Sequence, residues 1–230
     1  MKKFVPLKNY KLLQEKEMIA KAEKFNKLMK ERRTVREFST KSFPEEIIKN
    51  CILAANSAPS GANKQPWHFV IVKDSKLKTE IRIEAEKEEK EFYNSRASNE
   101  WLKDLEPFET NDSKPFLEDA PYLIVIFEEK YSIDEEVQLR NKHYAVTGKK
   151  KNYYVKESVG IATGILITAL HQCGLVSLTH TPIPMNFLNK ILHRPKNEKP
   201  FLLLVVGYPK EGVQVPNIKR KMFDEIATIL

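Results

Sequence analysis

The chain has 230 residues, with 39 Lys and Arg against 31 Asp and Glu, a formal net charge of +8 and 41% hydrophobic residues. This composition predicts a single globular domain over residues 1–230 and excludes an intrinsically disordered chain. No apolar run is long enough to cross a membrane and no apolar signal core follows Met1, so we expect a cytoplasmic protein without a membrane partner.

The first half of the chain predicts two helices, a strand, a third helix and a long loop. Apolar residues at helical spacing predict an amphipathic helix over residues 8–30. Ser42 and Pro44 open a second helix that runs to Ala55, with the proline in its first turn. A buried strand is expected at Trp67–Val72 and a charged helix at 76–95. The polar segment 98–116 is predicted to be irregular and is a candidate lid.

The second half predicts three strands and one helix of low charge. The strands are expected at Tyr122–Glu128, Val176–Thr181 and Phe201–Tyr208, and the helix at Tyr154–Cys173. Helices and strands mix without strict alternation, which indicates an α+β sandwich.

Several kinds of site are not expected. The seven glycines form neither a dinucleotide-binding fingerprint nor a P-loop, and no serine-hydrolase elbow occurs. The five histidines never stand three or four positions apart and no Cys-x-x-Cys occurs, so no metal site is predicted. Basic and acidic residues interleave along the chain, which favours a solvated surface over a nucleic-acid partner. Cys51 and Cys173 are predicted to be buried, reduced thiols, which suits a reducing compartment.

Two short segments are candidates for binding an anionic, planar ligand. Arg32, Arg33, Thr34 and Arg36 place three guanidiniums and a hydroxyl within five residues, a pattern that can clamp a phosphate. The alternative is a charged helix end beside acidic neighbours. The turn from Ala58 to Trp67 is rich in small residues, which let backbone N–H groups approach a planar ligand, although alone it is only a turn.

Together these segments resemble the nitroreductase superfamily of FMN enzymes, and within it the iodotyrosine deiodinase family. The likeness runs from about residue 4 to 226 and continues through the motifs YVKESVGIA (154–162), LTHTP (178–182), Arg194-Pro195, VGYP (206–209) and VPNIKRK (215–221). The resemblance implies an α+β nitroreductase-like fold, with a central, mostly antiparallel sheet flanked by helices. It also implies an intertwined homodimer with the active site at its interface.

By resemblance, the cofactor is FMN. Arg32, Arg33, Thr34 and Arg220 are expected to bind the phosphate and ribityl chain, and Arg36 the pyrimidine edge, where a cation stabilises the charge of reduced flavin. The remaining expected flavin contacts are Pro59, Ser60, Gly61, Thr179, His180 and Thr181. The family usually has serine at the position of Thr34; the hydroxyl is retained.

The family's substrate residues have counterparts in a lid over about residues 88–116. Glu89 and Tyr93 stand four apart, on one helix face, and Lys114 follows beyond the loop. Glu89 is expected to take the ammonium of an amino acid, and Tyr93 and Lys114 its carboxylate. The alternative for Glu89 is a solvated helix face, since acids and lysines alternate around it. The Ala62 backbone N–H is expected to bind the substrate phenolate.

The implied activity is FMN-dependent reductive dehalogenation of a halotyrosine, which releases halide and tyrosine; a simple halophenol is an alternative substrate. Thr181 is the expected catalytic residue, its hydroxyl donating to flavin N5 and favouring one-electron transfer; otherwise it is a β-branched strand end. The electron donor is not identifiable from the sequence. Alternatives are a broad-specificity nitroreductase or quinone reductase, a flavin-consuming enzyme that makes a cobalamin base, and a flavin-binding protein without turnover.

Overall fold

A computed structural model describes residues 4–133 and 149–230 of the chain. The chain divides into two compact units, Met1–Arg32 and Arg33–Leu230. The single domain over the whole chain stays a prediction. No helix in the described ranges is both long and apolar enough to span a bilayer.

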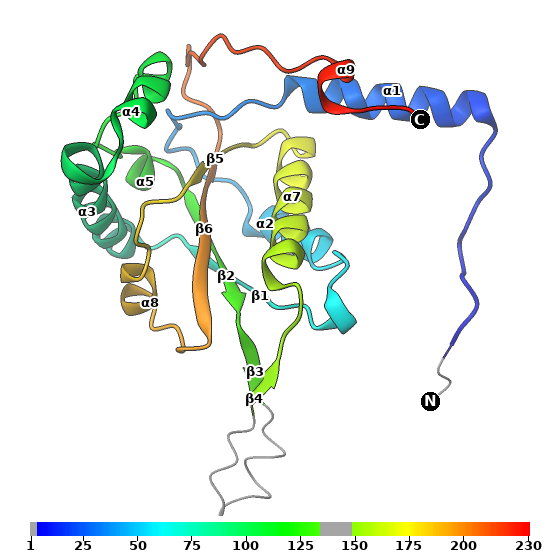
Figure 1. Cartoon of the computed structure of the whole chain (residues 1–230), viewed down its shortest axis with the longest axis horizontal. Helices are drawn as coiled ribbons and strands as arrows, with labels where there is room; N and C mark the ends of the chain where they lie inside the picture. The colour runs from blue at the N-terminus through cyan, green and yellow to red at the C-terminus, as the bar shows by residue number, and fades with distance from the viewer. Residues whose placement is uncertain (1–3, 134–148) are drawn as a thin grey trace, which may run out of the picture. The chain divides into compact units, whose positions relative to one another are not determined.

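The first unit contains helix α1 (Glu15–Glu31), drawn in blue in Figure 1. The predicted helix over 8–30 begins too early: α1 starts at Glu15, and Asn9 has a left-handed backbone (φ 64°) that a helix cannot include. Glu15 and Glu17 lie in the first turn, where acidic side chains favour the helix dipole. The predicted apolar stripe is present but exposed: Met18 and Ile19 are 54% and 58% accessible.

The second unit is built on a four-stranded sheet in the order β1 (Trp67–Val72), β2 (Tyr122–Glu129), β6 (Glu198–Gly207), β5 (Val176–His180). Every neighbouring pair is antiparallel, which confirms the predicted α+β class and sheet. Central strand β2 reads as a continuous apolar run because both of its faces are buried.

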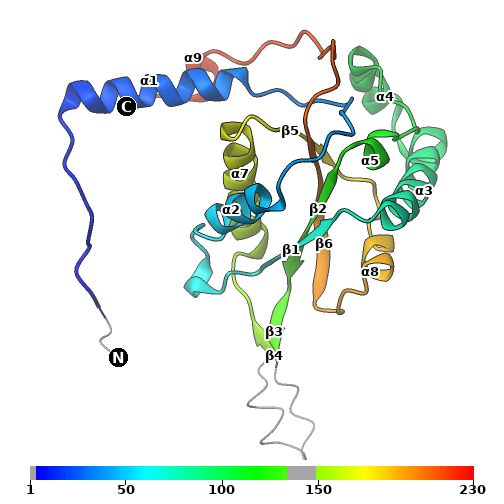
Figure 2. The same cartoon turned by 180° about the vertical axis from the view of Figure 1, so that it is seen from behind.

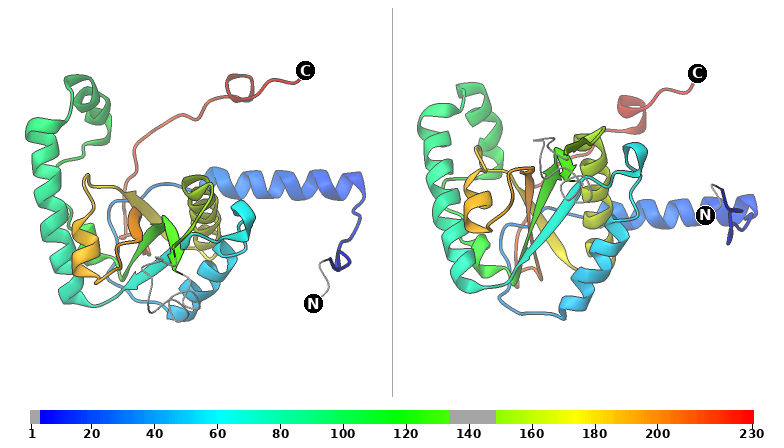
Figure 3. Two further views of the ribbon diagram at one scale, coloured as in Figure 1. Left: turned by 60° about the horizontal axis from the view of Figure 1, so that its bottom comes forward. Right: turned by 90° about the horizontal axis from the view of Figure 1, so that it is seen from below.

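Helices cover both faces of this sheet (Figures 1, 2 and 3). Helices α2 (Glu45–Ala55) and α7 (Val155–Gln172) pack on one face, over Ile124, Ile126 and Leu204. Helices α3 (Ser75–Glu91), α5 (Phe116–Asp119) and α8 (Phe187–Ile191) pack on the other, over Leu123, Val125 and Leu203. The alternation of side chains along each strand therefore divides the core into two layers.

The prediction that segment 98–116 is irregular was wrong in part. After α3, the chain forms a π-helical turn η2 (Phe92–Arg96), helix α4 (Asn99–Leu105) and a 3-10 turn η3 (Glu106–Phe108). The signal for α4 is its N-cap, since the Ser98 hydroxyl accepts from the Trp101 backbone N–H at 3.2 Å.

Some elements were not predicted. These are η1 (Gly61–Asn63), β3 (Tyr131–Ile133), β4 (Lys149–Lys151), α5, α8 and α9 (Phe223–Ile226). Strand β6 begins earlier than expected because its first residues, Glu198 and Lys199, are charged and give no apolar signal.

Candidate functional site

The arginine segment is fixed to the edge of the sheet. Thr34 forms a parallel bridge with Ser177 of β5, and the Val35 N–H donates to the Ser177 carbonyl at 3.4 Å. Further on, the Ser39 N–H donates to the Tyr208 carbonyl at 3.0 Å. The backbone thus brings the side chain of Arg36 next to the end of β5.

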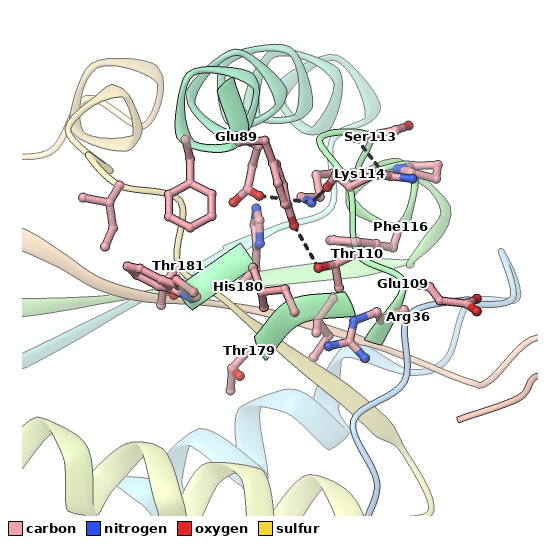
Figure 4. A pocket seen from close by; sticks show the side chains of 18 residues that line it. Arg36, Glu89, Glu109, Thr110, Ser113, Lys114, Phe116, Thr179, His180 and Thr181 are labelled. Atoms are coloured by element: carbon pink, nitrogen blue, oxygen red, sulfur yellow. Dashed lines mark hydrogen bonds and ion pairs between the residues drawn. The ribbon is translucent and has the colours of Figure 1, made fainter. Parts of the chain in front are cut away.

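A cavity of about 430 Å³ opens there (Figure 4). It is lined by the end of α3, η2 and α4, the segment before α5, and the end of β5. Seven residues predicted from the sequence line it together: Arg36, Glu89, Tyr93, Lys114, Thr179, His180 and Thr181. Residues from four separate parts of the chain therefore share one pocket.

The three predicted substrate residues contact each other. Lys114 Nζ lies 3.1 Å from Glu89 Oε2, and the two side chains are only 7% and 14% exposed. The same ammonium lies 5.6 Å from the ring centroid of Tyr93, within cation–π range. The solvated-face alternative for Glu89 is wrong, because its carboxylate pairs with a buried lysine.

Sequence reasoning gave no role to other pocket residues. The Tyr93 hydroxyl donates to Thr110 Oγ1 at 2.8 Å, which fixes the phenol against the far side of the lid. Trp101 packs edge-on against Phe92 with centroids 4.8 Å apart, and Phe116 forms part of the wall. The sequence signal that could have marked them as pocket residues was their aromatic character in an otherwise polar segment.

Strand alternation separates the residues at the end of β5. Thr179 and Thr181 are exposed, whereas His180 between them is 7% exposed. In Figure 4 the His180 ring points toward Glu89 and Lys114, with the Thr179 side chain on the other side of the strand. Burial, and then the Lys114 ammonium, lower the pKa of His180 to about 3, so its ring is neutral near neutral pH.

Arg36 brings a partly desolvated cation to the pocket. Burial lowers the pKa of its guanidinium, which lies 5.9 Å from the ring centroid of Phe108. An anionic or electron-rich group in the pocket would offset this desolvation.

The small-residue turn does not line this pocket. Ala58 packs into the α2–α7 side of the core, whereas Phe116 and Leu178 of the pocket belong to the other layer. A Cβ on Gly61 would lie 2.9 Å from the Tyr153 carbonyl oxygen, so this turn packs tightly against the start of α7. Pro59, Ser60, Gly61 and Ala62 are therefore not brought to Arg36 within the second unit.

The residues predicted to bind the phosphate do not line the pocket. Arg33 donates to the Pro216 carbonyl, which ties the arginine segment to the stretch that carries Arg220. Arg33 and Thr34 are half-buried and Arg220 is exposed. None of these three, nor Arg32, lines the cavity.

A second group of ionisable residues lies on the sheet away from the pocket. One side-chain ligand atom each of His68, Glu129 and Glu198 lies within 4.8 Å of the others. No sequence spacing could have revealed this group, because it joins three strands. Arg194 already donates to both oxygens of Glu198, at 2.6 and 2.7 Å, which assigns the Arg194-Pro195 motif a role in pairing a buried carboxylate.

The two cysteines are neighbours. Their sulfurs lie 3.9 Å apart between α2 and the end of α7, and both thiols are free. Cys51 is buried as predicted, and burial raises its pKa to about 12. The prediction for Cys173 was wrong, because it lies in the exposed turn that ends α7.

A sequence profile described as "Nitroreductase family" matches residues 29–208. The chain belongs to the nitroreductase family. Its resemblance to the iodotyrosine deiodinases within that family is also confirmed. The chain is 57% identical over 205 residues to an iodotyrosine deiodinase of Haliscomenobacter hydrossis, a match that covers 89% of this chain and 88% of the relative. It is 42% identical over 214 residues to human iodotyrosine deiodinase 1, covering 92% and 70%.

A comparison with a solved structure tests the fold of this nitroreductase-family chain. The crystal structure of oxidized iodotyrosine deiodinase bound to FMN and 3-iodo-L-tyrosine superposes with a TM-score of 0.72 at 33% identity. The match covers 89% of this chain and 100% of that one. The predicted nitroreductase-like fold is confirmed.

Proposed function

We propose that this protein is an FMN-dependent reductive dehalogenase that acts on halotyrosines. The observation that carries the proposal is the convergence of Glu89, Tyr93 and Lys114 on the pocket that also contains Arg36 and Thr181. A nitroreductase of broad specificity needs the flavin residues but has no need for a buried pair that matches an amino-acid zwitterion.

The residues present fit FMN. Arg33, Thr34 and Arg36 lie half-buried in one extended segment, and their donors match a phosphate and an electron-rich ring edge. Thr179 and Thr181 present exposed hydroxyls on one side of β5, beside Arg36 in the cavity lining. When bound, reduced FMN supplies two electrons which, with one proton, replace the carbon–halogen bond by a carbon–hydrogen bond and release halide.

The chain's own residues bind and orient the cofactor and the substrate. Arg36 would stabilise negative charge at the pyrimidine edge of the cofactor, and Arg33 and Arg220 would hold its phosphate. Thr181, which lines the pocket, would offer a hydroxyl donor to the flavin ring. The aromatic side chains of the lid exclude water from the substrate ring, which strengthens the ion pairs beside it.

The ammonium and carboxylate of the substrate replace the partners that Glu89 and Lys114 have in each other. Glu89 takes the ammonium, and Lys114 with the Tyr93 hydroxyl takes the carboxylate, so each buried charge keeps an opposite partner. The Glu89–Lys114 pair supports this arrangement, because its two charges are the complement of a zwitterion.

We further propose that a second copy completes the site. The turn that carries Pro59, Ser60, Gly61 and Ala62 follows Ala58, which packs in the layer opposite the pocket, and Gly61 lies against the start of α7. This position supports a role of the turn in a partner's pocket. Helix α7 offers a contact surface: Gly160, Ile161 and Gly164 are exposed, and added Cβ atoms on the glycines would meet nothing within 4 Å. Small residues at this spacing permit close helix packing. Helix α1 and the C-terminal segment carry further exposed apolar side chains, such as Phe25 and Phe223.

The cytoplasm is the proposed compartment. Two thiols 3.9 Å apart that remain free suit a reducing environment. The electron donor stays unassigned.

Halide release by the dithionite-reduced holoprotein tests the function. We expect iodide and tyrosine from 3-iodotyrosine in equal amounts. A protein that reduces nitroaromatics or quinones without releasing iodide is a nitroreductase instead. One that binds FMN and turns over neither substrate is a flavin-binding protein.

A further inference from the structure

Within the described residues, one buried polar atom of His180 has no partner. This atom, Nε2, is inaccessible to solvent and forms no hydrogen bond with any residue in the described ranges, and the ring packs edge-on against Phe116 with centroids 5.6 Å apart. Buried nitrogen atoms of this kind are nearly always paired, so the exception calls for an explanation. Because His180 lines the cavity, a group that moves on ligand binding can supply the missing partner.

The Lys114 ammonium is a candidate donor, because the His180 ring points toward it (Figure 4) and both side chains line the cavity. Burial, and then the charge of this ammonium, lower the pKa of His180. An ammonium has three N–H donors. Two of them are used within the protein, one by Glu89 Oε2 at 3.1 Å and one by the Asn111 carbonyl oxygen. One donor therefore remains for another acceptor.

Ligand binding changes what Lys114 faces. Under the proposed function, on which this inference rests, Glu89 turns to the ammonium of the substrate and releases Lys114. The lysine then needs an anchor that holds its head group while it binds the substrate carboxylate. The Asn111 carbonyl oxygen alone leaves the head group free to rotate about one hydrogen bond.

We propose that His180 is a positioning residue of the amino-acid subsite, whose Nε2 accepts a hydrogen bond from the Lys114 ammonium and aims another of its donors at the substrate carboxylate. With the Asn111 carbonyl oxygen accepting from a second N–H of the ammonium, the third N–H points in one direction only. His180 thus serves substrate specificity, whereas its neighbours Thr179 and Thr181 on the other side of β5 face the cofactor.

The protonation state of the ring suits this role. Burial and the Lys114 charge hold the pKa of His180 at about 3, so at neutral pH one ring nitrogen is always an acceptor. A protonated ring would repel Lys114 instead.

Two substitutions test the proposal in the FMN-loaded protein. His180→Phe keeps a ring beside Phe116 but removes the acceptor, and His180→Gln returns an acceptor as an amide oxygen. Binding of 3-iodotyrosine and of 2-iodophenol is followed by flavin fluorescence. For His180→Phe we expect iodotyrosine binding to weaken by roughly tenfold or more, the usual effect of losing a hydrogen bond to a charged group. Iodophenol binding should be unchanged, and His180→Gln should recover most of the loss.

A second measurement needs no variant. The ¹⁵N resonance of Nε2 in the wild-type complex with iodotyrosine should be that of an unprotonated, hydrogen-bonded nitrogen. Equal weakening of both ligands by His180→Phe, or a proton on Nε2 in the complex, overturns the proposal. If wild-type protein binds no iodotyrosine at all, the proposed function itself fails, whereas wild-type binding that His180→Phe leaves unchanged overturns only the role of His180.

Discussion

Lys114 and Glu89 form an ion pair, Nζ to Oε2 3.1 Å, between the segment before α5 and the last turn of α3. Both side chains are largely removed from solvent, so neither charge can be left alone cheaply. The pair lines the pocket and offers a cation and an anion to a ligand that carries both charges.

The first prediction concerns this pair. Lys114→Ala or Glu89→Gln should weaken 3-iodotyrosine binding by about 2–5 kcal/mol, the usual cost of removing one partner of a desolvated charge pair. Iodophenol offers nothing for these groups to hold, so its affinity should change little. The measurement is titration of the FMN-loaded protein with both ligands. Glu91→Gln, at an exposed position of the same helix, is the matched control. Equal losses for both ligands would make the pair structural.

Arg220 should contribute to FMN binding. Removing one charge-assisted hydrogen bond to the phosphate by Arg220→Ala should weaken FMN binding by about 1.5–3 kcal/mol. Titration of the apoprotein with FMN measures this, with the adjacent, exposed Lys219→Ala as control for loss of positive charge. If both variants lose the same small amount of FMN affinity, the effect comes from the lower net positive charge and not from a contact of Arg220.

Thr181 should separate dehalogenation from other flavin chemistry. Thr181→Ala removes the hydroxyl and leaves the phosphate residues untouched, so FMN should remain bound. Iodide release should fall while nitroaromatic reduction persists or rises. Thr181→Ser retains the hydroxyl and should restore iodide release. Full dehalogenation by the alanine variant would exclude the role assigned to this hydroxyl.

The exposed face of α7 should be required for assembly. Gly164→Leu places a bulky side chain where the proposed partner helix approaches, and should convert the dimer into a monomer with weakened FMN binding. Sedimentation velocity and the flavin content of the purified protein measure the two effects. Ser95→Leu, on the exposed end of η2, controls for added apolar surface. A wild-type monomer that binds FMN normally would contradict the shared site.

His180 should make stability depend on pH. Its pKa of about 3 lies below that of a histidine in an unfolded chain, about 6.5, so between these values the unfolded state binds more protons. The free energy of unfolding should therefore fall by about 1.4 kcal/mol for each pH unit below 6.5 and be fully retained above it. His180→Phe lacks this contribution, so its disadvantage relative to wild type should shrink by roughly 2 kcal/mol between pH 7 and pH 5 in urea unfolding. A constant difference would mean that His180 can protonate in the folded protein.

Local patterns were sufficient for most of the fold. Strand β1 lies at Trp67–Val72 as predicted, and α2 ends at Ala55, because burial, a proline near the start and apolar spacing all act over neighbouring residues. The same holds for Glu89 and Tyr93, whose four-residue spacing puts them on one side of the α3–η2 helix. Where the signal was weak, as in the charged start of β6 and the short helix α4, the boundaries or the element were missed.

The sequence alone determined the family, and it predicted an arginine segment for FMN and three residues for the substrate. Only the tertiary structure decided which of them meet. The bridge between Thr34 and Ser177 brings Arg36 to the pocket, and the folded lid brings Lys114 back to Glu89. The packing of the Gly61 turn on the other layer keeps Pro59–Ala62 away, and the pairing of β5 with β6 turns His180 toward Lys114. Sequence patterns report interactions over a few residues, whereas these contacts depend on strand pairing and layer packing between segments far apart in the chain.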